Sequence, residues 1–219
     1  PACNEGPRIA TVVRECALVC PSVPIVVVVN GCEDNTAEQA ESAGATILRS
    51  APGYGNALLA GYRFAAQQDD LPWLLQLDAD GQHPAHYIPS LLDALDGADL
   101  SIGSRLVEGG SAPGWARHRR WTILAMGVIT RRISGLPVRD VSSGFQAMRP
   151  EVVHALAADF SPDLTDANVL VRLFRKGFDI VEVPVRMAER QGGKSMHGGW
   201  RSLVYAGQTL MAVRDEMRG

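Results

Sequence analysis

The strongest constraint on the fold is a series of short apolar runs that alternate with helix-like segments. Residues 24–29 (PIVVVV) form a continuous β-branched run, and residues 73–77 (WLLQL) form a second run that ends at Asp78. Uninterrupted runs of this length are typical of strands covered on both faces, as in parallel sheets. Further strand-like segments are expected at 45–48, 99–102 and 179–185.

Helices are expected between these strands. The candidate segments are 36–43, 57–68, 88–95, 115–134, 165–176 and 202–214. Alternation of this kind predicts an α/β fold, with a mostly parallel sheet flanked by helices on both faces. A length of 219 residues fits one domain, so we expect a single domain over 1–219.

Composition excludes several classes of protein. The formal charge of −3 gives no overall basic field, so no nucleic acid partner is expected. No apolar run approaches the roughly 20 residues that cross a bilayer, and no signal peptide is visible, which predicts a cytoplasmic protein. The four cysteines have no zinc-like spacing and are interpreted as buried, reduced residues.

The most informative polar motif follows the second apolar run. Asp78 and Asp80 are two positions apart in an extended segment, so both carboxylates can face one ligand. Together with Gln82 they would offer hard oxygen ligands to Mg²⁺ or Mn²⁺ bound with phosphate oxygens. A solvated acidic turn at Gly81 is the alternative, because short acidic turns are common. His83 is interpreted as a residue that either supports the pair or begins the next helix.

Six other polar segments accompany this motif, most of them after a strand-like run, where ligands bind in α/β sheets. The full series is 1–5 (PACNE), 30–36 (NGCEDNT), 53–56 (GYGN), 77–84 (LDADGQHP), 103–105 (GSR), 140–145 (DVSSGF) and 190–195 (RQGGKS). In this order the chain resembles the family 2 glycosyltransferases of the GT-A (Rossmann-like) fold. Within that family it looks most like the dolichyl-phosphate and polyprenyl-phosphate mannosyltransferases and glucosyltransferases.

The resemblance implies a nucleotide-binding half over about 1–105 and an acceptor-side half over about 106–219. It implies catalytic roles for Asp80, Arg105 and Arg119, and Mg²⁺ or Mn²⁺ as the cofactor, held by Asp78, Asp80 and Gln82. A GDP- or UDP-linked sugar would be bound by Pro1, Cys3, Glu5, Asn30, Asp78, Ala79, Asp80, Gln82, Arg190 and Lys194.

The chain departs from the family pattern at several positions. Cys3 stands where a Tyr is usual, Asn30 where an Asp is usual and Tyr54 where a Lys is common; Met196 and Asn168 also replace charged residues. Relatives carry a strand before the stretch that matches 1–5, so the nucleotide side of the sheet is expected to be weakly supported. Because of these departures, a degenerate domain that binds nucleotide or glycan without catalysis is an alternative. A sugar nucleotidyltransferase is a further alternative, although no Gly-rich GxGxR-like loop is present.

The acceptor is predicted from the charged residues in the second half of the chain. A hydroxyl acceptor needs a general base, and only Asp140 and Asp166 stand out as candidates. Residues 115–132 carry five arginines around an apolar centre, namely Arg117, Arg119, Arg120, Arg131 and Arg132. This pattern favours an anionic lipid-linked acceptor at the inner face of the membrane, with a solvated helix as the alternative. The predicted reaction is therefore inverting transfer of a hexose to a polyprenyl phosphate or a related acceptor.

Overall fold

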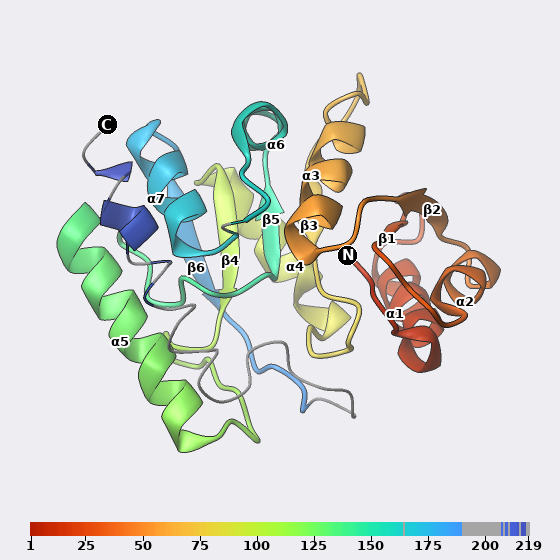
Figure 1. The fold of residues 1–219 in the computed structure, drawn as a ribbon, viewed down its shortest axis with the longest axis horizontal. Coiled ribbons are helices and arrows are strands. Elements are labelled where there is room, and N and C mark those ends of the chain that lie inside the picture. The colour runs from red at the N-terminus through yellow and green to blue at the C-terminus, as the bar shows by residue number, and fades with distance from the viewer. Residues whose placement is uncertain (164, 190–206, 208, 210, 215, 218–219) are drawn as a thin grey trace.

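The computed structural model of the chain describes residues 1–163, 165–189, 207, 209, 211–214 and 216–217, and Figure 1 shows the fold. The helices are α1 (Gly6–Val19), α2 (Thr36–Ser42), α3 (Tyr54–Ala65), α4 (Ile88–Asp93), α5 (Arg117–Ser134), α6 (Pro150–Asp159) and α7 (Ala167–Arg175), with short 3₁₀ helices at Ala85–Tyr87 and Ala94–Asp96. The strands are β1 (Val26–Val29), β2 (Thr46–Arg49), β3 (Leu74–Gln76), β4 (Leu100–Ser104), β5 (Gln146–Met148) and β6 (Ile180–Pro184).

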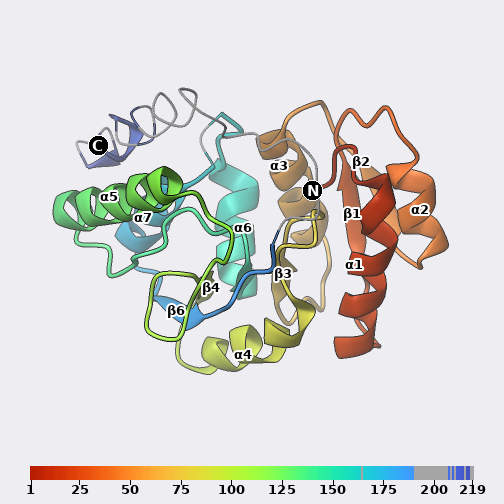
Figure 2. The same cartoon turned by 90° about the horizontal axis from the view of Figure 1, so that it is seen from below.

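The strands form two sheets. β1 pairs in parallel with β2, and a four-stranded sheet has the order β3-β5-β4-β6. In the larger sheet β4 and β6 are parallel, with Leu100 opposite Ile180, whereas β5 runs antiparallel to both β3 and β4. The view in Figure 2 places α4 on one side of the larger sheet and α3 and α6 on the other. The predicted α/β class, with helices covering both faces, is confirmed.

The alternation of side chains along the strands explains why both faces are covered. Leu100 and Ile102 of β4 pack with Met148 of β5 into a core that also takes buried residues of α3, α5, α6 and α7. Ala147 faces the other way, into a second core shared with α1 and α4. Because successive side chains point to opposite faces of a strand, each sheet residue is assigned to one core or the other.

The two sheets do not join into one. Between β1 and β3 lies a largely apolar cavity of about 500 Å³, lined by Val27 and Val28 on one side and by Leu74 and Leu75 on the other. The edge of β1 that faces this cavity is bonded at its end by Ala2, which donates to Val28 O (2.8 Å).

Most predicted elements are present, with small shifts at their ends. The structure adds α1, α6 and β5, which were not predicted, and starts α3 at Tyr54, three residues earlier than expected. Of the cysteines only Cys16 is buried, and Cys3 is exposed, so the interpretation of all four as buried residues is wrong. The predicted loop at 191–199 and most of the predicted helix at 202–214 lie outside the described residues. Among the helices that are described, none has the length and hydropathy of a membrane-crossing segment.

Candidate active site

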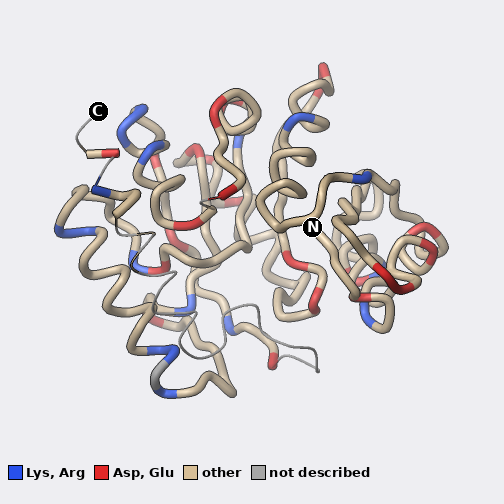
Figure 3. The backbone as a smooth tube through the Cα atoms, in the orientation of Figure 1, with Lys and Arg blue, Asp and Glu red and all other residues tan. Residues whose placement is uncertain are grey.

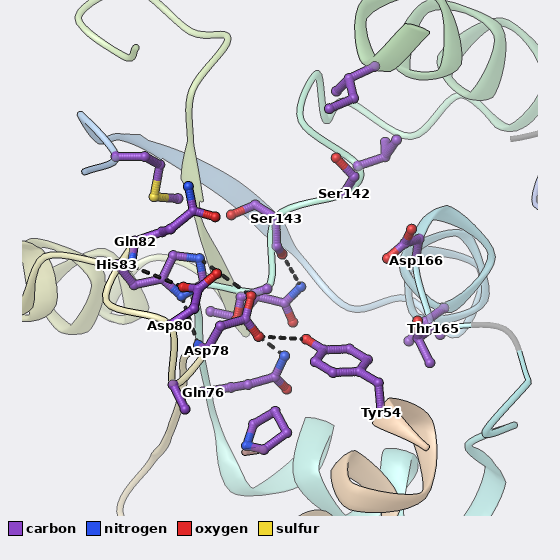
Figure 4. Close-up of a pocket in the computed structure, with 18 of the residues that line it drawn as sticks. Tyr54, Gln76, Asp78, Asp80, Gln82, His83, Ser142, Ser143, Thr165 and Asp166 are labelled. Carbon is purple, nitrogen blue, oxygen red and sulfur yellow. Dashed lines mark hydrogen bonds and ion pairs between the residues drawn. The ribbon is translucent and has the colours of Figure 1, made fainter. Parts of the chain in front are cut away.

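The acidic pair lies in a turn that follows β3. The backbone N–H of Asp78 donates to His83 Nδ1 (2.9 Å), and the N–H of Gln82 donates to Asp80 Oδ1 (3.0 Å). These two bonds close the turn and bring the side chains of Asp78 and Asp80 next to each other, as Figure 4 shows. The two carboxylates therefore lie close together in the structure, as predicted.

The partly buried Tyr54 and the buried His83 hold the Asp78 carboxylate. The Tyr54 hydroxyl donates to Asp78 Oδ1 (3.0 Å), and His83 Nε2 lies 3.8 Å from Asp78 Oδ2. The His83 ring stacks on Phe145, with ring centroids 5.0 Å apart and planes tilted by 6°. Burial lowers the pKa of His83, so its proton rests on Nε2 while Nδ1 accepts from the backbone. His83 therefore supports the pair, as predicted.

A layer of buried polar groups lies beneath the pair. Gln76 of β3 accepts a hydrogen bond from the Tyr62 hydroxyl and donates to the carbonyl of Gly144 (3.2 Å). Burial raises the pKa of Tyr54 and of Tyr62, so both hydroxyls stay protonated and act as donors. A Cβ at Gly144 would lie 3.0 Å from the Tyr54 hydroxyl, which explains why glycine occupies the turn that faces Asp78.

Arg105 is fixed by a buried ion pair. It donates to Asp140 from Nε (2.6 Å), from Nη2 (2.5 Å) and from its backbone N–H (3.0 Å), and Nη2 also donates to Ser142 (3.0 Å). Asp140 is fully buried, and its own N–H donates to Glu182 (2.9 Å). The predicted candidate base Asp140 is thus engaged by Arg105. Among the residues that the structure describes, the two N–H groups of Arg105 Nη1 have no acceptor, so they can bind a ligand.

An aromatic ring separates two arginines at this part of the site. The guanidinium carbon of Arg105 lies 4.4 Å from the centroid of Trp115, and that of Arg119 lies 5.2 Å from it. Both distances are within the range of a cation–π contact. The ring therefore helps to hold two positive groups close together, an arrangement that favours an anionic ligand.

These groups line one cavity of about 620 Å³. The predicted residues that line it are Pro1, Cys3, Glu5, Asn30, Asp78, Ala79, Asp80, Gln82, Arg105 and Arg119. Arg190 and Lys194 lie outside the described residues, and so does Met196. Asp166 and Thr165 face the acidic pair across the cavity in Figure 4. The fold thus gathers segments that are far apart in the sequence, from Pro1 to Met187.

Asn30 has an unusual environment at the end of β1. Its side chain is buried, and Oδ1 has no hydrogen-bond partner within the part of the chain that the structure describes. Buried acceptors are normally satisfied, so an unsatisfied one beside a cavity indicates a place for a ligand donor. The predicted donor-binding role of Asn30 fits this position.

Several residues of the site were not predicted. Trp115, Tyr62 and Gln76 line the cavity, and Ala188 binds the acidic turn through its N–H, which donates to Gln82 O (3.0 Å). Gln82 Nε2 in turn donates to Ala188 O (3.4 Å), so this side chain supports the segment after β6. Of these residues, only Trp115 could have been suspected from the sequence, because it lies directly before the arginine-rich helix.

The donor set of the acidic turn suits a divalent cation bound with a ligand. Within the described ranges no group of three or more His, Cys, Asp or Glu side chains could hold a metal ion by itself. Two carboxylates beside a large cavity fit Mg²⁺ or Mn²⁺, which often bind through one or two carboxylates and take their other ligands from phosphate and water. Asp78 and Asp80 are the residues that would hold it.

Comparison with known proteins identifies the class. A family model described as "Glycosyl transferase family 2" matches residues 1–157, and the chain belongs to this family. The polyprenol monophosphomannose synthase of Mycolicibacterium smegmatis is 32% identical over 211 residues, covering 91% of this chain and 79% of that protein. The undecaprenyl-phosphate mannosyltransferase of Micrococcus luteus is 33% identical over 195 residues, covering 82% and 78%.

Solved structures agree on the fold. Glucosyl-3-phosphoglycerate synthase from Mycobacterium tuberculosis, in complex with Mg²⁺ and uridine diphosphate, superposes with a TM-score of 0.70 at 21% identity, covering 100% of this chain and 77% of that one. The predicted GT-A fold and the predicted glycosyltransferase class are both confirmed.

Proposed function

We propose that this glycosyltransferase moves a hexose from a nucleotide-diphosphate sugar to a polyprenyl phosphate. The observation that carries the proposal is the composition of one cavity, which combines the Asp78–Asp80 pair with two arginines around Trp115. A pair of carboxylates suits a cation with a diphosphate, and a pair of arginines suits a second anion. A reaction between a diphosphate sugar and a phosphate needs both.

The donor half of the proposal rests on the segments around residues 1–5 and Asn30. The unsatisfied Oδ1 of Asn30 offers an acceptor for an N–H of the base or a hydroxyl of the ribose. Asp78 and Asp80 would hold Mg²⁺ or Mn²⁺, which when bound supplies positive charge for the departing diphosphate. Tyr54 and His83 fix the orientation of Asp78, so this carboxylate is already placed before the donor arrives. Gln82 as a third ligand stays a prediction.

The acceptor half rests on Arg105 and Arg119. Arg105 is held by Asp140 and Ser142, and within the described part of the chain two of its N–H donors are left for a phosphate oxygen. In the proposed step an acceptor phosphate oxygen bonds to the anomeric carbon while the bond to the diphosphate breaks on the opposite face, which inverts the configuration. A phosphate is already an anion and needs no base, whereas an alcohol acceptor would need one.

Asp166 supports the alternative of an alcohol acceptor, since it lines the cavity and faces the acidic pair. The relatives named polyprenol monophosphomannose synthase and undecaprenyl-phosphate mannosyltransferase favour the phosphate acceptor, a lipid that is held in a membrane. We therefore place the protein in the cytoplasm, in peripheral contact with that membrane.

The donor assignment is tested by calorimetric titration with GDP, UDP and their hexose conjugates, with and without Mn²⁺. We expect tight binding for one base, at least 10-fold stronger with Mn²⁺ and lost in Asp80→Asn. Asp96→Asn, which removes an exposed carboxylate outside the cavity, is the control and should bind as the parent protein does. Metal-independent binding that survives in Asp80→Asn would contradict the site.

Two activity assays distinguish the proposed transferase from a domain that only binds its ligand and from a nucleotidyltransferase. Slow hydrolysis of the bound sugar nucleotide with Mn²⁺ would exclude a domain that only binds its ligand. Release of pyrophosphate from a nucleoside triphosphate and a sugar phosphate would instead assign it to the nucleotidyltransferases.

A further inference from the structure

Helix α5 has two faces with different environments. Thr122, Ile123 and Met126 line the cavity, and Thr130 further along the helix is buried. On the outside, Trp121 is 68% exposed and Val128 is 39% exposed. Residues spaced by three and seven positions share a helix face, so Trp121, Leu124 and Val128 form one apolar stripe, with Ile129 beside it. The helix is therefore a wall with the cavity on one side and exposed apolar residues on the other.

Positive charge lies at both ends of this stripe. Arg117 and Arg120 are in the first turn of α5 and Arg131 and Arg132 are in the last, and its sequence contains no Asp or Glu. Figure 3 shows the blue segments near the two ends of this helix. A solvated helix would be expected to mix both signs of charge and to expose few large apolar side chains. The outer face of α5 is instead apolar at its centre and cationic at its ends.

This pattern matches the chemistry of an anionic bilayer surface. At 18 residues α5 is about 27 Å long, and it does not have the hydropathy to cross a membrane. Helices of this kind lie in the plane of the interface, with Trp and aliphatic residues among the acyl chains and arginines at the headgroups. A protein partner would need an acidic groove to match, while anionic lipid satisfies both features at once.

We propose that the outer face of α5, defined by Trp121, Leu124, Val128, Arg131 and Arg132, rests on an anionic membrane surface. The opposite face of the helix, with Arg119 and Thr122, lines the cavity, so docking in this way would bring the cavity close to the bilayer. A lipid phosphate could then reach Arg105 and Arg119 while its chain stays in the leaflet. That last step rests on the proposed function, whereas the docking itself does not.

The docking is tested by co-sedimentation with vesicles of phosphatidylcholine alone and of phosphatidylcholine with 30% phosphatidylglycerol. The double variant Trp121→Ser/Val128→Ser should bind the anionic vesicles at least 10-fold more weakly than the parent protein. Leu18→Ser is the matched control, because Leu18 is 82% exposed on α1, and it should bind as the parent does. Equal binding by the double variant and the control would overturn the proposal.

A second variant tests the charge separately. Arg131→Gln/Arg132→Gln should lose roughly 30-fold in binding to anionic vesicles, at about 5-fold per arginine, and little to neutral ones. Size-exclusion chromatography tests whether a second copy of the chain covers this face instead. If the parent protein is a dimer that does not bind vesicles, and the Trp121→Ser/Val128→Ser variant is a monomer, the face is a dimer interface and the proposal is overturned. Nucleotide titration without vesicles should be unchanged in all these variants. Loss of vesicle binding with intact nucleotide binding therefore separates a docking defect from a failed active site.

Discussion

Replacement of Asp140 by Asn should destabilise the protein strongly. Asp140 is fully buried and accepts three hydrogen bonds from Arg105, whose side chain is 9% exposed. The variant keeps the shape of the side chain but leaves the guanidinium buried without its counter-ion. Removal of one partner of a buried ion pair costs about 3–5 kcal/mol, far more than the pair contributes in net terms.

Urea unfolding followed by circular dichroism measures this cost as a change in unfolding free energy. At about 2–4 °C per kcal/mol for a chain of this size, the melting temperature should fall by roughly 6–20 °C. Asp159→Asn is the matched control. Asp159 pairs with Lys176 (3.0 Å) at the surface, where its side chain is 54% exposed, and such pairs contribute at most about 1 kcal/mol.

The double variant Arg105→Met/Asp140→Leu removes both charges and should recover part of the loss in stability. The reasoning would be refuted if Asp140→Asn cost no more than Asp159→Asn. The same result would remove the argument that Arg105 is held in place for a ligand.

Three further outcomes are expected. Tyr54→Phe removes the donor to Asp78 Oδ1, so the apparent affinity for Mn²⁺ in the nucleotide titration should fall about 10-fold or more, and an unchanged affinity would remove Tyr54 from the site. Gly55→Ala would put a Cβ 1.9 Å from the carbonyl oxygen of Pro162, so thermal melting should show a loss of at least about 2 kcal/mol; full stability would contradict the packing. Burial raises the pKa of Cys16 to about 11, so iodoacetamide at pH 8 should label the exposed Cys3 in the native protein and label Cys16 only after unfolding, as read by mass spectrometry. Rapid native labelling of Cys16 would show that α1 does not pack as described.

Much of the fold was predictable because the apolar strand runs are unambiguous. The runs at 24–29 and 73–77 became β1 and β3, and the polar residues that follow them line the cavity. The two missed helices also carry a signal. Ile9, Val12, Val13 and Cys16 are spaced to share one face of α1, and Pro7 is placed near its start, where proline is well tolerated.

The rest depends on contacts that a linear pattern does not contain. Strand β5 lies between β3 and β4 and runs antiparallel to both, which brings Gly144 close to Gln76 and Asp78. The bond from Tyr54 to Asp78 and the commitment of Asp140 to Arg105 join residues 24 and 35 positions apart. Spacing indicated that these residues were important, but only their packing shows which of them touch the ligand and which position another side chain.

The reaction itself is tested most directly by sugar transfer to a lipid. The protein is incubated with Mn²⁺, a radiolabelled GDP- or UDP-hexose and either undecaprenyl phosphate or undecaprenol in anionic vesicles, and the lipid phase is counted. We expect a labelled product from the phosphate and none from the alcohol, with Asp80→Asn inactive and Asp96→Asn fully active. Labelling of the alcohol alone, or equal labelling by Asp80→Asn, would contradict the proposed function.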